Sequence, residues 1–88
     1  MILKNENKKP IIEYPCEWIY KVIGTDIEKI IEAFEEASMG LTYNVKSSNI
    51  SKNGKYFSLN FFIEVPNETI RNLIFEKLEK NPNIKFVL

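Results

Sequence analysis

The sequence of 88 residues holds few side chains that could catalyse a reaction or bind a metal. It contains no histidine, which is the commonest general base near neutral pH and the commonest metal ligand. Its one cysteine, Cys16, has no second thiol with which to bind a metal or form an internal disulfide, and no histidine to activate it as a nucleophile. The sequence therefore predicts no catalytic residue, no metal site and no cofactor.

One candidate site for a small ligand follows the first predicted strand. Gly24 and Thr25 precede a predicted helix, and the N–H groups at a helix N-terminus can bind an anion or a carboxylate. A structural role competes with this hypothesis, because Thr25 would occupy those N–H groups as the N-cap and Asp26 would repel an anion. We favour the structural role and keep Gly24 and Thr25 as a candidate ligand loop.

A second candidate site is the face of the predicted sheet that points away from the core. A mixture of aromatic, aliphatic and lysine side chains on such a face is typical of a surface that binds a protein or a ligand. The competing interpretation is a solvated face with scattered apolar residues. The candidate binding face comprises Ile19, Lys21, Ile23, Tyr56, Ser58, Asn60, Phe62, Lys85 and Val87.

The strand predicted from Lys55 to Val65 is the element on which this face depends. Its residues alternate along the whole segment, and a period of two is typical of a strand buried on one face. Burial of its five inward apolar side chains could contribute about 7–15 kcal/mol before the entropy cost is subtracted, so this strand should be central. The five are Phe57, Leu59, Phe61, Ile63 and Val65.

The first and last predicted strands also alternate. The first runs from Cys16 to Ile23, and both of its faces are partly apolar, so the sequence leaves the buried face open. We choose Trp18, Tyr20 and Val22 as its inward side chains, because a lysine lies in the middle of the other face. The last runs from Ile84 to Leu88. Its inward side chains should be Ile84, Phe86 and Leu88, with Lys85 and Val87 pointing outward.

The second predicted strand, from Leu41 to Ile50, has few apolar residues and should lie at an edge of the sheet. The segment that follows it, Ser51-Lys52-Asn53-Gly54, ends in the residue pair preferred in a type I′ hairpin, because both residues accept positive φ. This strand should therefore pair with the central one in antiparallel fashion.

Two helices are predicted from apolar repeats of three and four residues. The first runs from Asp26 to about Met39, with Thr25 as its N-cap and Gly40 at the C′ position. The acidic residues Glu28, Glu32, Glu35 and Glu36 are predicted to form a solvated face of this helix, and the alternative is a docking patch for a basic partner. The second helix follows Asn67 as N-cap and ends at about Lys80, and its inward stripe is Ile70, Leu73, Ile74 and Leu78.

The predicted order of elements is β-α-β-β-α-β. Because crossover connections are right-handed, this order favours an α+β ferredoxin-like fold, with a four-stranded antiparallel sheet and both helices on one face. The first and third strands would be central. Residues 15–88 would form this single domain, and residues 1–14 would be a polar lead-in whose order the sequence leaves open.

Four segments spread over most of the chain carry a resemblance to a known family. They are Glu13-Tyr14-Pro15, Tyr20-Lys21-Val22-Ile23-Gly24, Ser51-Lys52-Asn53-Gly54-Lys55-Tyr56-Phe57-Ser58 and Val87-Leu88. With these segments the chain resembles the YbeD-like family of small bacterial proteins. Members of this family are similar in fold to ACT-like regulatory domains, which often dimerise and sense amino acids. The resemblance implies this fold and a bacterial cytoplasmic setting, and it supplies no catalytic residues.

Charge and hydropathy exclude further classes of function. Twelve basic residues balance twelve acidic ones, so the chain has no net charge to attract a polyanion. RNA-recognition motifs share the predicted topology, but the glycine–aromatic pattern of their central strand is absent here. No apolar run approaches the roughly 20 residues that a membrane-spanning helix needs, and the polar N-terminus has no signal-peptide pattern. These observations predict a cytoplasmic protein with no membrane contact.

The leading hypothesis is a non-catalytic regulatory or protein-interaction module that acts through its open sheet face or a sheet edge. Its partner would be another protein or a second copy of the chain, and a small metabolite would be a second kind of ligand. The alternative is an RNA-binding module that uses the outward face of the central strands, although the neutral charge disfavours nucleic acid. A third hypothesis is a small enzyme with Lys21 as its base or anion binder.

Overall fold

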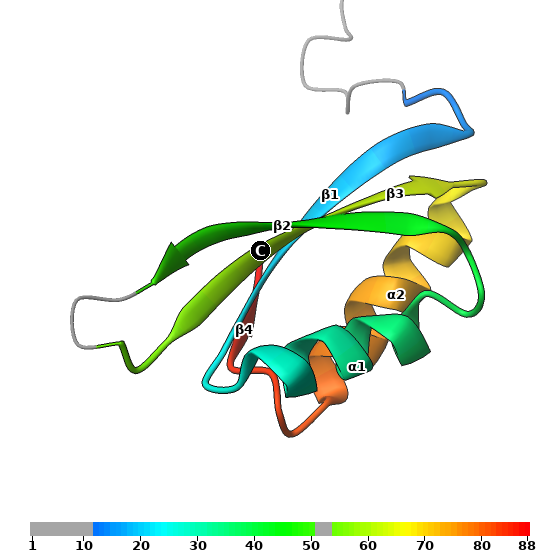
Figure 1. The fold of residues 1–88 in the computed structure, drawn as a ribbon. Helices are drawn as coiled ribbons and strands as arrows, with labels where there is room; N and C mark the ends of the chain where they lie inside the picture. Colours follow the sequence, from blue (N-terminus) through cyan, green and yellow to red (C-terminus); the bar gives the residue numbers. More distant parts are fainter. Residues whose placement is uncertain (1–11, 51–53) are drawn as a thin grey trace, which may run out of the picture.

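The computed structural model describes residues 12–50 and 54–88, without the side chains of residues 48–50, and contains four strands and two helices (Figure 1). In chain order these are β1 (Cys16–Gly24), α1 (Ile27–Ala37), β2 (Tyr43–Ile50), β3 (Phe57–Val65), α2 (Glu68–Lys80) and β4 (Phe86–Val87). The strands form one antiparallel sheet in the order β2-β3-β1-β4. The predicted α+β ferredoxin-like fold is confirmed, with β1 and β3 at the centre and β2 at an edge.

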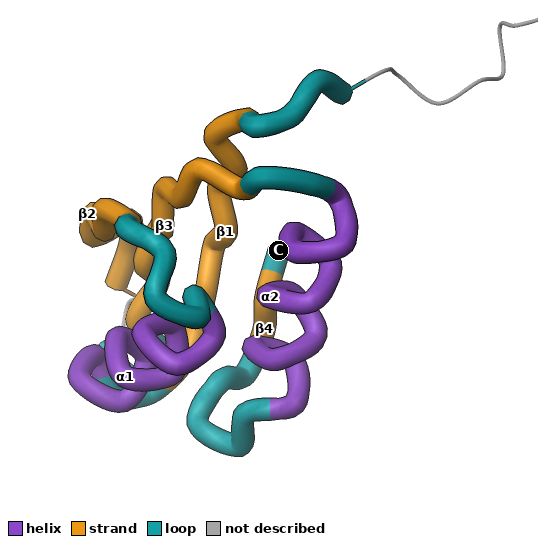
Figure 2. Tube along the Cα trace, turned by 90° about the vertical axis from the view of Figure 1, so that its right-hand side faces the viewer, coloured by secondary structure: helices purple, strands orange, loops and turns teal. Residues whose placement is uncertain are grey.

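Both helices cover the same face of the sheet, and the core fills the space between the two layers (Figure 1). Figure 2 shows the short strand β4 beside α2. Phe34 of α1 lies fully buried at the centre of the core. Its ring stacks on Phe61 of β3, with 4.1 Å between centroids and 8° between planes, and meets the ring of Tyr43 edge-on at 5.0 Å.

The central pair of strands follows the predicted alternation. β1 pairs with β3 over nine positions, from Cys16 opposite Val65 to Gly24 opposite Phe57. Tyr20 and Val22 are buried against the helices, and Trp18 packs at the border of the core. The predicted inward face of the first strand is therefore confirmed, because the period of two places these side chains on one side of the pleat.

The prediction of which side chains of the last strand point into the core is wrong. Val87 lies opposite the buried Val22 and packs against the core, whereas Phe86 lies opposite Ile23 and is 62% exposed. Leu88 is 72% exposed, so of the three predicted inward residues only Ile84 is buried, in the turn before β4. The strand begins at Phe86 rather than Ile84, and a change of one residue in register moves every side chain to the opposite face.

The ends of α1 differ from prediction, by one residue at the N-cap and by about two at the C-terminal end. Asp26, not Thr25, is the N-cap of α1, and its carboxylate accepts a hydrogen bond of 3.3 Å from the N–H of Lys29. α1 ends at Ala37 rather than near Met39. The chain after the helix has two consecutive residues with positive φ, Met39 at 55° and Gly40 at 88°, where the sequence predicted only Gly40. Gly40 thus supports the turn as the second of two residues with positive φ.

α2 begins and ends as predicted. The side-chain oxygen of Asn67 accepts a hydrogen bond of 2.8 Å from the N–H of Ile70, and the helix runs to Lys80. Ile74 and Leu78 are fully buried and Ile70 is half-buried, but Leu73 is exposed. The apolar stripe of α2 is therefore narrower than predicted.

The edge strand and its hairpin are described in part. β2 begins at Tyr43 instead of Leu41, and its register on β3 shifts between Ser47 and Asn49. Residues 51–53 of the predicted type I′ turn lie outside the described residues, and Gly54 has a φ of 68°. The antiparallel pairing of β2 with β3 is confirmed.

The position of the N-cap leads to a direct prediction. Asp26→Ala should lower the free energy of unfolding by about 0.5–1 kcal/mol, because it removes the acceptor for the Lys29 N–H and a negative charge beside the helix N-terminus. Thr25→Ala, on the exposed residue before it, should change the free energy by less than about 0.5 kcal/mol. Urea denaturation of both variants measures the difference. A larger loss for Thr25→Ala would show that the threonine is the cap in solution.

Candidate interaction surface

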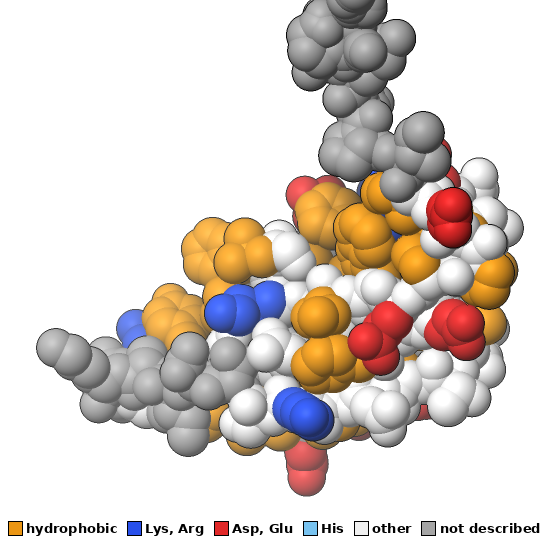
Figure 3. Space-filling view, turned by 90° about the horizontal axis from the view of Figure 1, so that it is seen from above, with side chains coloured by type: hydrophobic (Ala, Val, Ile, Leu, Met, Phe, Trp, Pro, Cys, Tyr) orange, Lys and Arg blue, Asp and Glu red, His pale blue; other side chains and the backbone are white. Residues whose placement is uncertain are grey.

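The open face of the sheet, which neither helix covers, carries side chains in rows that run across the strands (Figure 3). Glu17 of β1 lies opposite Glu64 of β3 in the first row, and Ile19 lies opposite Phe62 in the next. The third row is continuous from the edge strand to the C-terminus and consists of Lys46, Asn60, Lys21 and Leu88. The fourth contains Ser58, Ile23 and Phe86.

Large apolar side chains on this face are well exposed. Ile19 is 52% exposed, Phe86 62% and Leu88 72%. Figure 3 shows hydrophobic side chains spread over the face and interleaved with lysines. Because exposed apolar area on a sheet gains free energy when it is covered, this arrangement suits a surface that another molecule covers.

The charged groups on the face are ordered by sign. Glu17 and Glu64 form the row nearest the start of β1. Lys21 lies four residues further on along β1, and Lys46 of β2 lies opposite Asn60 in the same row as Lys21. The ammonium group of Lys46 lies 5.6 Å from the centroid of the Phe62 ring, within the range of a cation–π contact. The apolar row of Ile19 and Phe62 thus separates an acidic row from a basic one.

The structure brings together most of the candidate binding face. All the predicted members on β1 and β3, namely Ile19, Lys21, Ile23, Ser58, Asn60 and Phe62, lie on the open side of the sheet. Tyr56 lies just before β3, and its side chain is 37% exposed. Ser58 is only 9% exposed, so it forms the floor of the face rather than its surface.

The structure corrects the C-terminal part of this face. Val87 points into the core and cannot belong to it, and Phe86 and Leu88 replace it. Lys85 is exposed and precedes β4, where its N–H donates a hydrogen bond of 2.7 Å to the carbonyl oxygen of Ile23. Among the last five residues, apolar side chains occur at both odd and even positions, so the sequence does not alternate clearly. It therefore held no signal that could identify which of these side chains point outward.

The candidate ligand loop has a clear structural role. A Cβ atom at Gly24 would lie 2.9 Å from the carbonyl oxygen of Asn83 and 2.9 Å from Cγ1 of Ile30, so only glycine fits between the start of α1 and the turn before β4. The Asp26 carboxylate, rather than a ligand, accepts from the first turn of α1. A ligand at Gly24 and Thr25 stays a prediction that these contacts do not require.

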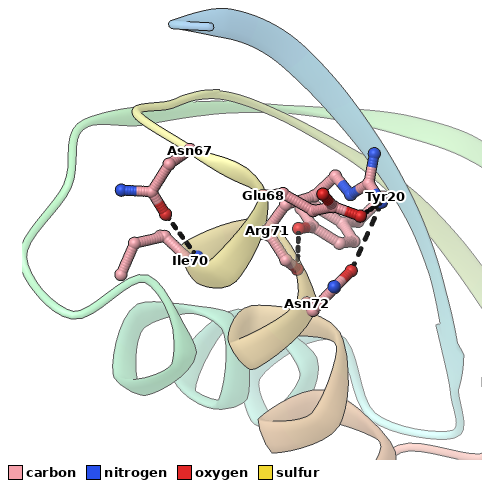
Figure 4. Close-up of polar contacts among 6 residues, drawn as sticks. All are labelled: Tyr20, Asn67, Glu68, Ile70, Arg71 and Asn72. Atoms are coloured by element: carbon pink, nitrogen blue, oxygen red, sulfur yellow. Dashed lines mark hydrogen bonds and ion pairs between the residues drawn. The ribbon is translucent and has the colours of Figure 1, made fainter. Parts of the chain in front are cut away.

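Sequence reasoning missed a polar cluster between β1 and α2 (Figure 4). The hydroxyl group of Tyr20 donates a hydrogen bond of 2.6 Å to the carbonyl oxygen of Arg71, and burial raises the pKa of Tyr20 to about 12 despite the nearby charge of Arg71. The Arg71 guanidinium lies 4.3 Å from the centroid of the Trp18 ring and 3.6 Å from a carboxylate oxygen of Glu68. The only sequence signal was that Trp18 and Arg71 are the single tryptophan and arginine in the chain.

The cluster borders a cavity of about 240 Å³. Its lining is mostly apolar, and the Arg71 side chain beside it is only 17% exposed. Arg71 contacts Glu68 and Asn72 within α2 and Trp18 on β1, so its contact with Trp18 helps to hold α2 against β1. The cavity is lined by Trp18, Tyr20, Arg71, Asn72, Phe75 and Leu88.

Within residues 12–50 and 54–88, no group of three or more cysteine, aspartate and glutamate side chains is arranged to hold a metal ion. Neither of the two helices found in that part of the chain is long and apolar enough to cross a membrane. Cys16 is a half-buried free thiol.

The candidate interaction surface is the open sheet face. It is defined from here on by Glu17, Ile19, Lys21, Ile23, Lys46, Phe62, Glu64, Phe86 and Leu88.

The fold of the chain is ACT-like. Its structure is similar to the ACT domain from the GTP pyrophosphokinase of Chlorobium tepidum, with a TM-score of 0.57. The match covers 82% of this chain and 94% of that domain at 17% sequence identity, so the likeness is one of fold.

The chain belongs to the family described as protein of unknown function (DUF493), whose model matches residues 9–88. It is similar to the solution structure of protein HP0495 from Helicobacter pylori, with a TM-score of 0.83 and 35% identity over 98% of this chain and 94% of that one. It is 42% identical to protein Cj0253 of Campylobacter jejuni, over 92% of this chain and 91% of that protein. A UPF0250 protein of Hahella chejuensis is 29% identical over 96% of this chain and 97% of its own length. The resemblance to YbeD-like proteins is thereby confirmed.

Proposed function

We propose that this chain is a non-catalytic interaction module that binds a protein partner through the open face of its sheet. The observation that carries the proposal is the exposure of Ile19 and Phe86, each more than half accessible, on the open side of the sheet. A sheet of this kind normally keeps one polar face in water, whereas this face presents apolar rows. A regulatory role is consistent with the ACT-like fold, and binding through this face is the means by which the module would exert it.

Several features favour a protein partner over RNA. The aromatic rings of Phe62 and Phe86 lie on the open face, as stacking would require, but Glu17 and Glu64 form an acidic row beside Phe62. These carboxylates would repel a phosphate backbone that crossed the face. A protein surface can present both charge signs in the same pattern and cover the apolar rows as well.

The absence of histidine from the whole sequence supports a non-catalytic role. Lys21, the residue that an enzyme on this face would use, lies between Asn60 and the C-terminal residue Leu88, with no acid or base partner opposite it in its row. We therefore propose that Lys21 contributes charge to binding rather than a proton to a reaction.

The double variant Ile19→Glu and Phe62→Glu tests the proposal. We expect it to remove the bound polypeptide, because two carboxylates would then stand in the apolar row that the partner covers. Native mass spectrometry of the chain purified gently from its own cells, wild type and variant in parallel, measures the loss. Ile27→Glu is the matched control, since Ile27 is 39% exposed at the start of α1, away from the open face.

Thermal unfolding of each variant alone separates loss of binding from loss of folding. If the double variant folds and keeps every associated polypeptide, the proposal is wrong. Recovery of bound nucleic acid, lost in the same double variant and in rising salt, would also overturn it in favour of the RNA alternative.

A further inference from the structure

The open face carries a charge pattern that is complementary to itself. Along β1 the outward residues are Glu17, Ile19 and Lys21, so a negative, an apolar and a positive side chain follow one another at intervals of two. On the neighbouring strands, Glu64 lies on one side of Phe62 and Lys46 on the other, beside Asn60. On β1 and on the neighbouring strands alike, the row of Ile19 and Phe62 therefore lies between a row of negative charge and a row of positive charge.

This pattern selects one of two face-to-face arrangements. A two-fold axis that runs across the strands, along the row of Ile19 and Phe62, places β1 antiparallel to its copy. Glu17 then faces Lys21 of the second copy, and Lys21 faces the second Glu17. A two-fold axis parallel to the strands instead places Glu17 against Glu64 of the second copy, and like charges meet.

The dimensions of packed sheets permit the first arrangement. Glu17 and Lys21 each lie two residues from the axis, which is about 7 Å along a strand. Two sheets pack about 10 Å apart with strands crossing at about 30°, which displaces these positions by about 3 Å. Glutamate and lysine side chains are long and flexible enough to meet across this distance, while Ile19 and Phe62 fill the centre.

We propose that the partner of the open sheet face is a second copy of this chain, docked face to face about the Ile19–Phe62 row. The inference rests on the proposed function, which it makes specific by naming the occupant. The symmetry gives two Glu17–Lys21 pairs, and Glu64 of each copy approaches Lys46 of the other. The apolar row supplies contact area, and the charges determine the direction in which the copies meet.

Two charge-reversal variants, studied alone and mixed, test this dimer. Glu17→Lys gives a copy with only positive charges at the two positions, and Lys21→Glu gives one with only negative charges. Each variant alone repels itself at both symmetric contacts, so its dissociation constant should rise at least about tenfold. An equimolar mixture pairs unlike charges at both contacts and should restore a dimer with nearly wild-type affinity.

Sedimentation equilibrium of the full chain, from roughly micromolar to millimolar concentration, measures the affinities. Lys77→Glu, which reverses an exposed lysine on α2, is the matched control and should dimerise like the wild type. Because Lys21 is half-buried, Glu64→Lys and Lys46→Glu provide a second complementary pair, on exposed residues, if Lys21→Glu fails to fold.

Three results would overturn the proposed dimer. A mixture that stays monomeric while the wild type dimerises overturns this arrangement, as does a dimer that both reversals leave unchanged. A wild type that is monomeric throughout also overturns it. If such a monomer still binds another polypeptide that Ile19→Glu and Phe62→Glu remove, the proposed function stands and only the identity of the partner is wrong.

Discussion

Phe34→Ala should lower the free energy of unfolding by about 3–5 kcal/mol, which is most of the stability expected for a domain of this size. The ring is fully buried and lies at the point where α1 meets the sheet. It stacks on Phe61 and meets Tyr43 edge-on, so its removal leaves a cavity bordered by aromatic rings rather than by side chains that can collapse into it. Urea denaturation followed by far-ultraviolet circular dichroism measures the loss.

Phe86→Ala is the matched control, because it deletes the same ring from the open face. Phe86 is 62% exposed, so its removal should change the free energy of unfolding by less than about 0.5 kcal/mol. The measurement should be made on dilute protein, where association through the open face does not contribute. Equal losses for the two variants would mean that β4 has the facing expected from the sequence, with Phe86 inward, and that the open face is incorrectly defined.

The second large effect concerns alkaline pH. Burial raises the pKa of Tyr20 to about 12, from 10 in the unfolded chain, because the buried phenol loses the water that would stabilise its ionised form. The contribution of this group to stability is fully present below pH 10 and is lost as the pH rises through 12, because the unfolded chain releases the proton first. Because Tyr20 is only 2% exposed, this rise in pKa from 10 to about 12 corresponds to a loss of about 2–3 kcal/mol in the free energy of unfolding.

Tyr20→Phe isolates this effect from other groups that titrate in the same range. These include Tyr43, whose pKa is raised to about 12 by burial and by the hydrogen bond of 2.7 Å that its hydroxyl donates to Glu35. At neutral pH the variant should be about 1 kcal/mol less stable than the wild type, because it loses the hydrogen bond to the Arg71 carbonyl oxygen. Between pH 10 and pH 12 the order should reverse, because only the wild type has this phenol to ionise.

Urea denaturation of both proteins at closely spaced pH values provides the comparison. A difference in stability that stays constant from pH 7 to pH 12 would show that Tyr20 ionises with an ordinary pKa in the folded chain. That result would also imply that the contact between Tyr20 and α2 opens in solution.

The strongest inferences from the sequence concern elements whose pattern allows one interpretation. Alternation in β3 predicted its buried face and its share of the open face, because a period of two over nine residues with one apolar side can be buried in only one register. Both faces of β1 are partly apolar, so only the lysine in the middle of one face favoured the facing that the structure shows. Asn67 likewise predicted the start of α2, because asparagine is a preferred N-cap residue and Glu68 in the first turn complements the helix dipole.

Where the local pattern allowed two interpretations, tertiary contacts decided between them. Thr25 and Asp26 are both good N-cap residues, so residue type does not decide between them, and in the folded chain Asp26 is the cap. Leu73 fits the apolar repeat of α2 but is exposed, because the buried contacts of this helix converge on Ile74 and Leu78.

The sequence by itself determined that this chain is a βαββαβ domain with one apolar, lysine-bearing face left open. Only the tertiary structure decided which C-terminal side chains belong to that face and how its charges are ordered. The register of β4 depends on the turn that precedes it, since apolar residues stand at both parities from residue 84 to 88. The opposed rows of Glu17 with Glu64 and Lys21 with Lys46 arise from pairing between strands distant in sequence, which no local pattern encodes.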